Sequence, residues 1–303
     1  MSNINELLSY RTFVKGVSGS VGAAVSLSIF YPLDLLRTKL QADKSNRDLD
    51  NVLAELWRLI QQDGVFGLYR GLRLNITALS VSSFVYFYAF HGLKHMWPGE
   101  TAQTAQRDIV LALIAGTVNV LLTCPLWVAS TRAKLNKYKV KKRGNEFSDD
   151  SDNDEASDMF SMLQNIYASE GAHGLWHGWS YSLALCSNPV INFVIYEALK
   201  RQVLLLTRSS IISGSVAFLI GVISKFFATV LTYPLQVIQC RSREGDSGTF
   251  RQFLTTTFRI HGLKGYFRGL DAKLLQTILT AALMFLIYER LTAAIFTAFG
   301  LKF

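Results

Sequence analysis

Two lysines stand in or beside long apolar segments, where a charged side chain is unusual. Lys225 lies nine residues before Pro234 in an apolar run, and Lys273 lies three residues before Gln276. A charge at membrane depth is costly, so such a residue is a functional hypothesis by default. Each lysine could bind an anion such as a phosphate, because its ammonium group is a compact positive charge. The competing interpretation is that each lysine reaches the membrane surface or pairs with a neighbour.

The histidines, cysteines and acidic residues form no catalytic or metal-binding motif. His173 and His177 are four apart, but no glutamate stands between them as a zinc-protease helix requires. The three cysteines fall in apolar stretches without metal-ligand spacing. The alternating aspartates of 150–154 lack the glycine and closing glutamate of a calcium loop. With no G-x-S-x-G, P-loop or dinucleotide motif, we expect neither an enzyme nor a protein that holds a cofactor.

Two signatures recur three times each, in the same order along the chain. In the first, an apolar run meets a proline and continues into a polar or basic tail, at Pro32, Pro125 and Pro234. The second is DGVFGLYRG at 63–71, EGAHGLWHG at 170–178 and HGLKGYFRG at 261–269. Ordered recurrence marks a repeat architecture. The predicted repeats are 8–100, 104–205 and 206–303.

Each repeat contains two long apolar segments with a short amphipathic segment between them. The apolar segments predict membrane-spanning helices at 13–30, 74–97, 109–123, 181–203, 211–232 and 274–299, the fourth interrupted at Asn188 and Pro189. The amphipathic segments predict surface helices at 51–62, 159–169 and 250–260. Each repeated proline removes a backbone donor and should kink its helix, where neighbours or cavity water satisfy the freed carbonyl.

The net charge of +9 has two interpretations that are compatible with each other. Lys and Arg gather on the retained side of a membrane protein, and they also attract anionic substrates. One stretch, 137–158, breaks the repeat, with basic residues at 137–143 and an acidic run at 149–158. Blocks of like charge are usually solvated, so we expect a flexible loop. The alternative for the basic part is a targeting or lipid-contact patch.

The threefold pattern resembles that of the mitochondrial carrier family, over essentially the whole chain. The family motif P-x-[DE]-x-x-[KR]-x-[KR], followed by [DE]-G and an aromatic-basic-glycine, resembles the two signatures above. The resemblance implies an all-α membrane protein. Six tilted helices and three short surface helices would surround a pseudo-threefold axis and a central water-filled cavity. It also implies alternating access between an odd-helix gate on the motif side and an even-helix gate opposite.

By position, the motif-side gate departs from the charge pairs of the family. Its residues are Asp34, Arg37, Trp127, Ser130, Gln236 and Gln239. The family's pairing of acid to base then gives Asp34 to Ser130, Trp127 to Gln239 and Gln236 to Arg37, none a complete salt bridge. Gln41 resembles the family's glutamine brace. We expect hydrogen bonds to charged partners to close this gate, and to hold it more weakly than the opposite one.

The opposite gate resembles the family motif [FY]-[DE]-x-x-[KR] more closely. Its residues are His91, Lys94, Glu197, Lys200, Glu289 and Thr292. The resemblance implies two full ion pairs, Lys94 with Glu197 and Lys200 with Glu289. His91 and Thr292 would form a hydrogen bond at most.

The substrate site of such a carrier is expected near midspan. An asymmetric cargo needs residues that differ between repeats, whereas a gate needs equivalent ones. Seven residues after the last signature glycines stand Ala78, Leu185 and Gln276, which resemble the family's three contact points. The first two offer shape and apolar contact, suited to a flat base, and Gln276 offers hydrogen bonds. Lys225 and Lys273 would meet phosphate, and Asn75 is a further candidate.

Within the family, residues 84–88, 119–132 and 272–288 resemble the peroxisomal branch that carries nucleotides and coenzyme A. The resemblance implies exchange of nucleotide-like anions (coenzyme A, FAD, NAD and AMP or other adenine nucleotides) across the peroxisomal membrane. A monomer without a cofactor or nucleic-acid partner is expected. Its other partners would be membrane lipids and an import receptor for peroxisomal membrane proteins. The alternatives are a mitochondrial inner-membrane carrier of NAD, FAD, folate or pyrimidine nucleotides, and a passive channel.

Overall fold

The computed structural model describes residues 22, 24–43, 51–96, 104–135, 159–207, 213–245, 248 and 250–298. For residues 95, 104–106, 215, 261, 285, 288–289 and 292–298, the backbone alone is described. This part of the chain is helical and contains no strand. The charged loop 137–158 and most of the predicted first span lie outside it.

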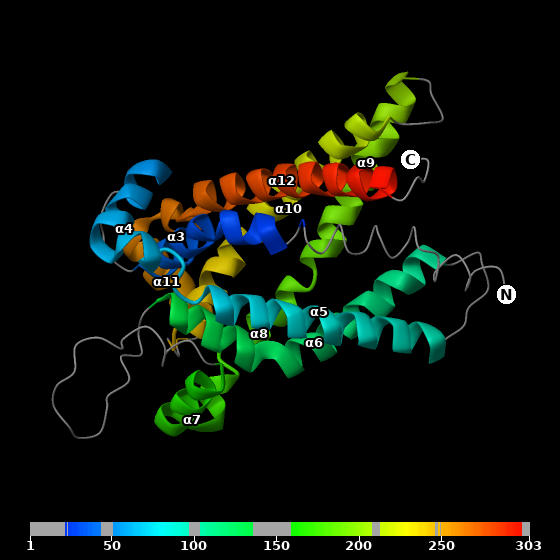
Figure 1. The fold of residues 1–303 in the computed structure, drawn as a ribbon. Coiled ribbons are helices and arrows are strands. Elements are labelled where there is room, and N and C mark those ends of the chain that lie inside the picture. The colour runs from blue at the N-terminus through cyan, green and yellow to red at the C-terminus, as the bar shows by residue number, and fades with distance from the viewer. Residues whose placement is uncertain are drawn as a thin grey trace. The chain divides into compact units, whose positions relative to one another are not determined.

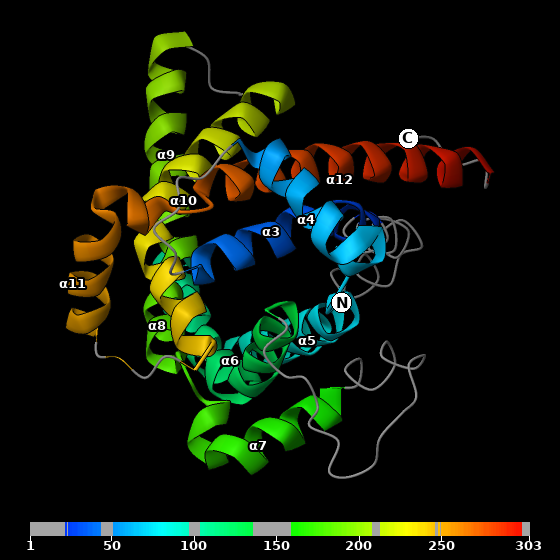
Figure 2. The ribbon, with the colours of Figure 1, turned by 90° about the vertical axis from the view of Figure 1, so that its left-hand side faces the viewer.

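The helices fall into two compact units, which are taken separately. The smaller unit covers 1–37, 50–69 and 271–303, and the larger covers 38–49 and 70–270. The smaller unit holds most of α3 (Tyr31–Ala42), with α4 (Val52–Gly67) and nearly all of α12 (Leu270–Ala298). The larger unit holds α5 (Leu72–Met96), α6 (Thr104–Lys134), α7 (Met159–Leu175), α8 (Trp179–Leu185), α9 (Asn188–Thr207), α10 (Gly214–Arg243), α11 (Phe250–His261) and the short 3₁₀ helix η3 (Leu263–Phe267). In it α5 packs along α6 and α9 along α10 (Figures 1 and 2).

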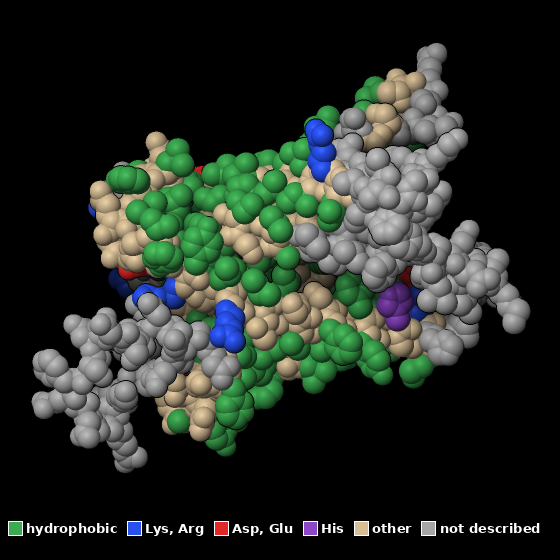
Figure 3. All heavy atoms as spheres, in the orientation of Figure 1, with side chains coloured by type: hydrophobic (Ala, Val, Ile, Leu, Met, Phe, Trp, Pro, Cys, Tyr) green, Lys and Arg blue, Asp and Glu red, His purple; other side chains and the backbone are tan. Residues whose placement is uncertain are grey.

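Four helical stretches are long and apolar enough to cross a membrane. They are Leu72–Lys94, Arg107–Lys134, Trp179–Thr207 and Val216–Arg243. The third is broken between α8 and α9, at the interruption predicted beside Pro189. Large apolar side chains such as Tyr88 of α5 and Leu122 of α6 are 75% and 64% exposed. Hydrophobic side chains spread along these two helices, as a lipid-facing surface requires (Figure 3).

The signature glycines adopt the same backbone conformation in every repeat. The φ angles are +71° and +76° at Gly64 and Gly71, +70° and +78° at Gly171 and Gly178, and +59° and +77° at Gly262 and Gly269. Side chains other than glycine rarely adopt this left-handed region. Each signature is therefore the same turn, leading from a surface helix into the next span.

The repeated prolines differ in their place within the helices. Pro125 and Pro234 lie inside α6 and α10, which continue through them. Pro32 is the second residue of α3 and follows a turn at Phe30. In α6, the carbonyl of Leu121, four residues before Pro125, accepts a hydrogen bond from the indole N–H of Trp176 at 3.1 Å. A neighbour thus satisfies the carbonyl that Pro125 frees, as the sequence predicted.

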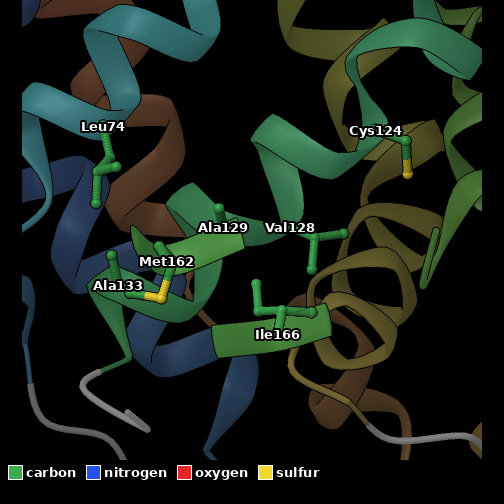
Figure 4. Packing of buried hydrophobic residues seen from close by; sticks show 7 residues of the cluster. All are labelled: Leu74, Cys124, Val128, Ala129, Ala133, Met162 and Ile166. Atoms are coloured by element: carbon green, nitrogen blue, oxygen red, sulfur yellow. The ribbon is translucent and has the colours of Figure 1, made fainter. Parts of the chain in front are cut away.

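A buried cluster fixes the end of α6 against its surface helix. It consists of Leu74, Cys124, Val128, Ala129, Ala133, Met162 and Ile166 (Figure 4). These residues come from α5, α6 and α7, and removing such apolar surface from solvent stabilises their contact by about 25 cal/mol per Å². The polar residues that alternate with them on α6 are therefore held in fixed positions.

Candidate gate and anion site

Buried arginines join the ends of the odd helices to one another. In the larger unit, which includes the last turn of α3, the Nε of Arg241 donates to the carbonyl of Gln41 at 3.0 Å. The Nε of Arg132 donates to the carbonyl of Arg243 at 2.9 Å. Carbonyls in the last turn of a helix lack helical partners and carry partial negative charge, so cations are favoured there. The ends of α3, α6 and α10 are thus connected through two guanidinium groups.

Arg132 is also the centre of a charged cluster. Its side chain is fully buried, and its two terminal nitrogens lie 2.7 Å from the two carboxylate oxygens of Glu170. The Nδ1 of His177 lies 3.1 Å from Arg132 and 3.3 Å from the carboxylate. Glu170 is the acid of the second signature, so this cluster joins the signature to the end of α6.

In two repeats, the residue before the proline contacts the second signature of its own repeat. The thiol of Cys124 lies 3.9 Å from the carbonyl of His177, and the hydroxyl of Tyr233 donates to the carbonyl of Arg268 at 2.9 Å. His177 and Arg268 both stand one residue before the last signature glycine. The same register recurs in two repeats, which explains why the two signatures occur together.

A second repeated contact involves the residue four positions after the last signature glycine, which we call the latch position. The latch of the first repeat, Asn75, accepts from Ser130 at 3.3 Å and from Lys134 at 2.9 Å. That of the second, Ser182, accepts from Gln239 at 2.8 Å and from Arg243 at 3.2 Å. The donors stand five and nine residues after Pro125 and Pro234 respectively. Asn75 thus contacts two residues of α6, one of which is the predicted gate residue Ser130, while its predicted contact with cargo stays a prediction.

Ser182 and the latch role were missed at the sequence level. The signal was present, because Asn75, Ser182 and Lys273 are all polar at equivalent positions. Lys273 is the latch residue of the third repeat, which lies in the smaller unit.

The remaining motif-side residues have contacts within their own unit. Asp34 and Arg37 lie 3.5 Å apart on α3. The guanidinium of Arg243 lies over the ring of Trp127 at 5.8 Å. Among the described residues, Trp127 thus contacts Arg243 and Gln239 contacts Ser182, and the two do not pair with each other. The pairs Asp34 to Ser130 and Gln236 to Arg37 would join the two units and stay predictions.

At the opposite gate, the charged side chains have partners that the sequence did not predict. Lys94 of α5 forms an ion pair with Asp108 of α6 at 3.0 Å, and Glu197 pairs with Lys200 on its own helix at 3.4 Å. Among the described residues, the pair of Lys94 with Glu197 is thus not formed. The ring of His91 stacks on that of Phe87. The side chains of Glu289 and Thr292 lie outside the described residues.

A polar chain begins at Lys225, the predicted phosphate contact. Its ammonium group donates to the side-chain oxygen of Asn188 at 3.3 Å. This partner is a neutral amide, so the positive charge in a membrane-spanning helix is left without compensation from it. Asn192 lies one turn further along α9, and its side-chain oxygen is buried without a hydrogen-bond partner among the described residues. The site therefore offers a cation beside amide groups.

The three predicted contact points differ in their environment. Ala78 is fully buried, on a face of α5 where Ser82 also hydrogen-bonds Asn119 of α6 at 3.2 Å. This burial leaves Ala78 no surface for a cargo in this structure. Leu185 is half-buried at the end of α8. In the smaller unit, the side-chain oxygen of Gln276 is buried without a partner among the described residues, as is the hydroxyl of Thr280 one turn further.

Comparison with known proteins gives one consistent family. The family model described as mitochondrial carrier protein matches residues 9–101, 102–205 and 212–298. The chain belongs to the mitochondrial carrier family. This confirms the all-α fold with three tandem repeats, and it makes the protein a transporter and not an enzyme.

The relatives of this carrier include several peroxisomal proteins. It is 40% identical to the peroxisomal membrane protein PMP34 of Mus musculus, over 98% of this chain and 97% of that protein. It is 30% identical to the peroxisomal adenine nucleotide carrier 1 of Glycine max, over 94% and 92%. It is 27% identical to the peroxisomal nicotinamide adenine dinucleotide carrier of Arabidopsis thaliana, over 92% and 94%. The expectation of a multi-pass protein of the peroxisomal membrane is confirmed.

Proposed function

We propose that this carrier exchanges nucleotide-like anions across the peroxisomal membrane by alternating access, without a cofactor. The cargoes are adenine nucleotides such as AMP, together with NAD, FAD and coenzyme A. The observation that carries the proposal is the ammonium of Lys225, which is bonded to the neutral Asn188 inside a membrane-spanning helix. A phosphate group would compensate this charge, because its anionic oxygens bring the opposite charge that the amide of Asn188 lacks.

The amide groups near Lys225 and on α12 support the same proposal. The buried oxygen of Asn192, in the larger unit, and that of Gln276, in the smaller unit, have no partner among the described residues, and each could accept from an amine or hydroxyl of a nucleotide. Leaving a buried acceptor unsatisfied costs about 1–3 kcal/mol, so a ligand that donates to it gains affinity. The names of the adenine nucleotide and NAD carriers among the relatives agree with cargoes of this class.

The other expected partners follow from this function. Membrane lipids would cover the exposed apolar faces of a monomeric carrier. The basic segment 137–143 is the proposed contact for lipid headgroups or an import receptor, and it lies outside the described residues.

Exchange in proteoliposomes tests the proposal. Vesicles are loaded with AMP, NAD, FAD or coenzyme A, and uptake of radiolabelled AMP is measured. We expect saturable uptake that internal nucleotide stimulates and that Lys225→Ala abolishes. The matched control is Lys264→Ala, which removes an exposed lysine from η3. Uptake that neither saturates nor responds to internal nucleotide would indicate a channel, and no uptake of any nucleotide would contradict the proposed cargo.

A further inference from the structure

A continuous chain of hydrogen bonds leads from Lys225 to the gate position Gln236. Lys225 donates to the oxygen of Asn188 at 3.3 Å, and the amide nitrogen of Asn188 donates to the hydroxyl of Thr232 at 2.6 Å. The amide nitrogen of Gln236 donates to the same hydroxyl at 3.1 Å. All four residues lie in the larger unit.

The hydroxyl of Thr232 is the branching point of this chain. It donates to the carbonyl of Ala228 at 2.8 Å and accepts from both Asn188 and Gln236. A hydroxyl has one proton and two acceptor lone pairs, so all its capacity is used. Thr232 is 6% exposed, which makes each of these hydrogen bonds costly to lose without replacement.

Helix geometry makes the chain possible. Lys225, Thr232 and Gln236 stand at positions i, i+7 and i+11 of α10, which share one face. Asn188 is the first residue of α9, at the break that separates it from α8. Its side chain therefore connects Lys225 and Thr232, which are two helical turns apart on α10, from the neighbouring helix.

We propose that Lys225, Asn188, Thr232 and Gln236 form a relay that couples anion binding to the motif-side gate. Asn188 is the positioning residue for Lys225, and Thr232 is the link to Gln236. The relay rests on the proposed function, because it assigns a task to the same anion site.

The order of acceptor strength explains how the relay responds to cargo. A phosphate oxygen is a stronger acceptor for an ammonium group than an amide oxygen. When a phosphate of the cargo accepts the hydrogen bond from the ammonium group of Lys225, the side-chain oxygen of Asn188 loses its donor. The Asn188 side chain is then free to rotate. That motion changes the hydrogen bond to Thr232 and, through the shared hydroxyl, the one that holds Gln236.

Exchange kinetics separate the relay from simple cargo contact. Thr232→Val removes the shared hydroxyl at nearly constant shape, and we expect the maximal exchange rate to fall about fivefold with KM for AMP unchanged within about twofold. Thr232→Ser keeps the hydroxyl and should restore the rate. Thr229→Val is the matched control, because the side chain of Thr229 is also buried on α10 and takes no part in the relay; only its carbonyl, which the substitution keeps, lies near the Thr232 hydroxyl, at 3.4 Å. Asn188→Asp should raise KM, because a carboxylate would compete with phosphate for Lys225.

An unchanged exchange rate in Thr232→Val would overturn the relay. A second measurement is independent of the cargo and uses Cys240. This thiol is 7% exposed and lies 3.7 Å from the carbonyl of Thr38, in the C-terminal half of α3. In a Cys124→Ala, Cys186→Ala parent it is the sole cysteine of the chain, so its alkylation by a maleimide reports opening of the motif side.

We expect Thr232→Val to alkylate about threefold faster than the parent without nucleotide, and AMP to accelerate the parent alone. Faster alkylation in Thr232→Val with no effect of AMP in the parent would support the relay and contradict the proposal that AMP is a cargo. Equal rates in the two proteins, or an equal AMP effect in both, would overturn the relay.

Discussion

The indole nitrogen of Trp176 donates to the carbonyl oxygen of Leu121, four residues before Pro125 on α6. A proline cannot donate to that carbonyl, and in a membrane every freed carbonyl needs a partner. The partner here is the signature aromatic that stands two residues before Gly178. The first signature creates an unpaired acceptor, and the second supplies the donor that satisfies it.

Trp176→Phe is expected to destabilise the carrier. Phenylalanine keeps most of the ring but has no N–H, so the loss should be about 1 kcal/mol and lower the melting temperature in detergent. Trp179→Phe is the matched control, because Trp179 is 45% exposed and belongs to no hydrogen bond of its indole in the described residues. An equal melting temperature for the two variants would show that the Leu121 contact contributes nothing.

The sequence predicted the repeats well because each repeat carries its own evidence. The conformation of a proline or glycine depends mainly on its neighbours along the chain. The recurrence of Gly64, Gly171 and Gly262 in the signature therefore predicts the same turn in every repeat from sequence alone. The family resemblance then assigned the gate positions, which stay predictions.

Partners between helices were less predictable, because several polar residues compete for the same side chain. Lys94 was expected to face Glu197, yet Asp108 is its partner at 3.0 Å. Asn75 was expected to contact cargo, yet Ser130 and Lys134 of α6 both donate to its oxygen. Such choices depend on helix rotation and on the state of the gates, which the spacing of residues does not encode.

Glu170→Gln is expected to destabilise the carrier strongly. Arg132 is fully buried, and removing one partner of a buried ion pair costs about 3 kcal/mol, because the remaining charge is left uncompensated. Glu197→Gln is the matched control. Its carboxylate is 30% exposed, close to the 31% of Glu170, but it pairs with the partly exposed Lys200. Exposed pairs contribute at most about 1 kcal/mol. Melting temperatures that fall equally in both variants would rule out a special role for the Arg132 pair.

His177 makes stability depend on pH. Burial lowers its pKa below the ordinary value of 6.5, Arg132 and His173 act in the same direction, and Glu170 opposes them. The unfolded chain therefore binds a proton at higher pH than the folded chain does. The stability is present above about pH 6.5 and is lost as the pH falls below that value.

We expect the melting temperature to fall between about pH 7.5 and about pH 5.5, and to fall less in His177→Asn. His173→Asn, which removes the ring 5.1 Å from that of His177, is the comparison variant. Its profile should stay close to that of the unaltered protein. Parallel profiles for the unaltered protein and His177→Asn would contradict this assignment.

Lys273 occupies the third latch position, but its ammonium group can only donate, whereas Asn75 and Ser182 accept at this position. Asn75 and Ser182 each contact the residues five and nine positions after a proline, which in the first repeat are Arg37 and Gln41. If Lys273 is a latch, Lys273→Ala, which removes its polar group, should leave KM for AMP unchanged within about twofold. Alkylation of Cys240 in the single-cysteine parent should then rise about threefold, because the closed gate has lost a contact. If Lys273 instead contacts phosphate, KM for AMP should rise in Lys273→Ala while the alkylation rate of Cys240 stays constant. The two readouts move separately, so one variant decides between the gate and the cargo.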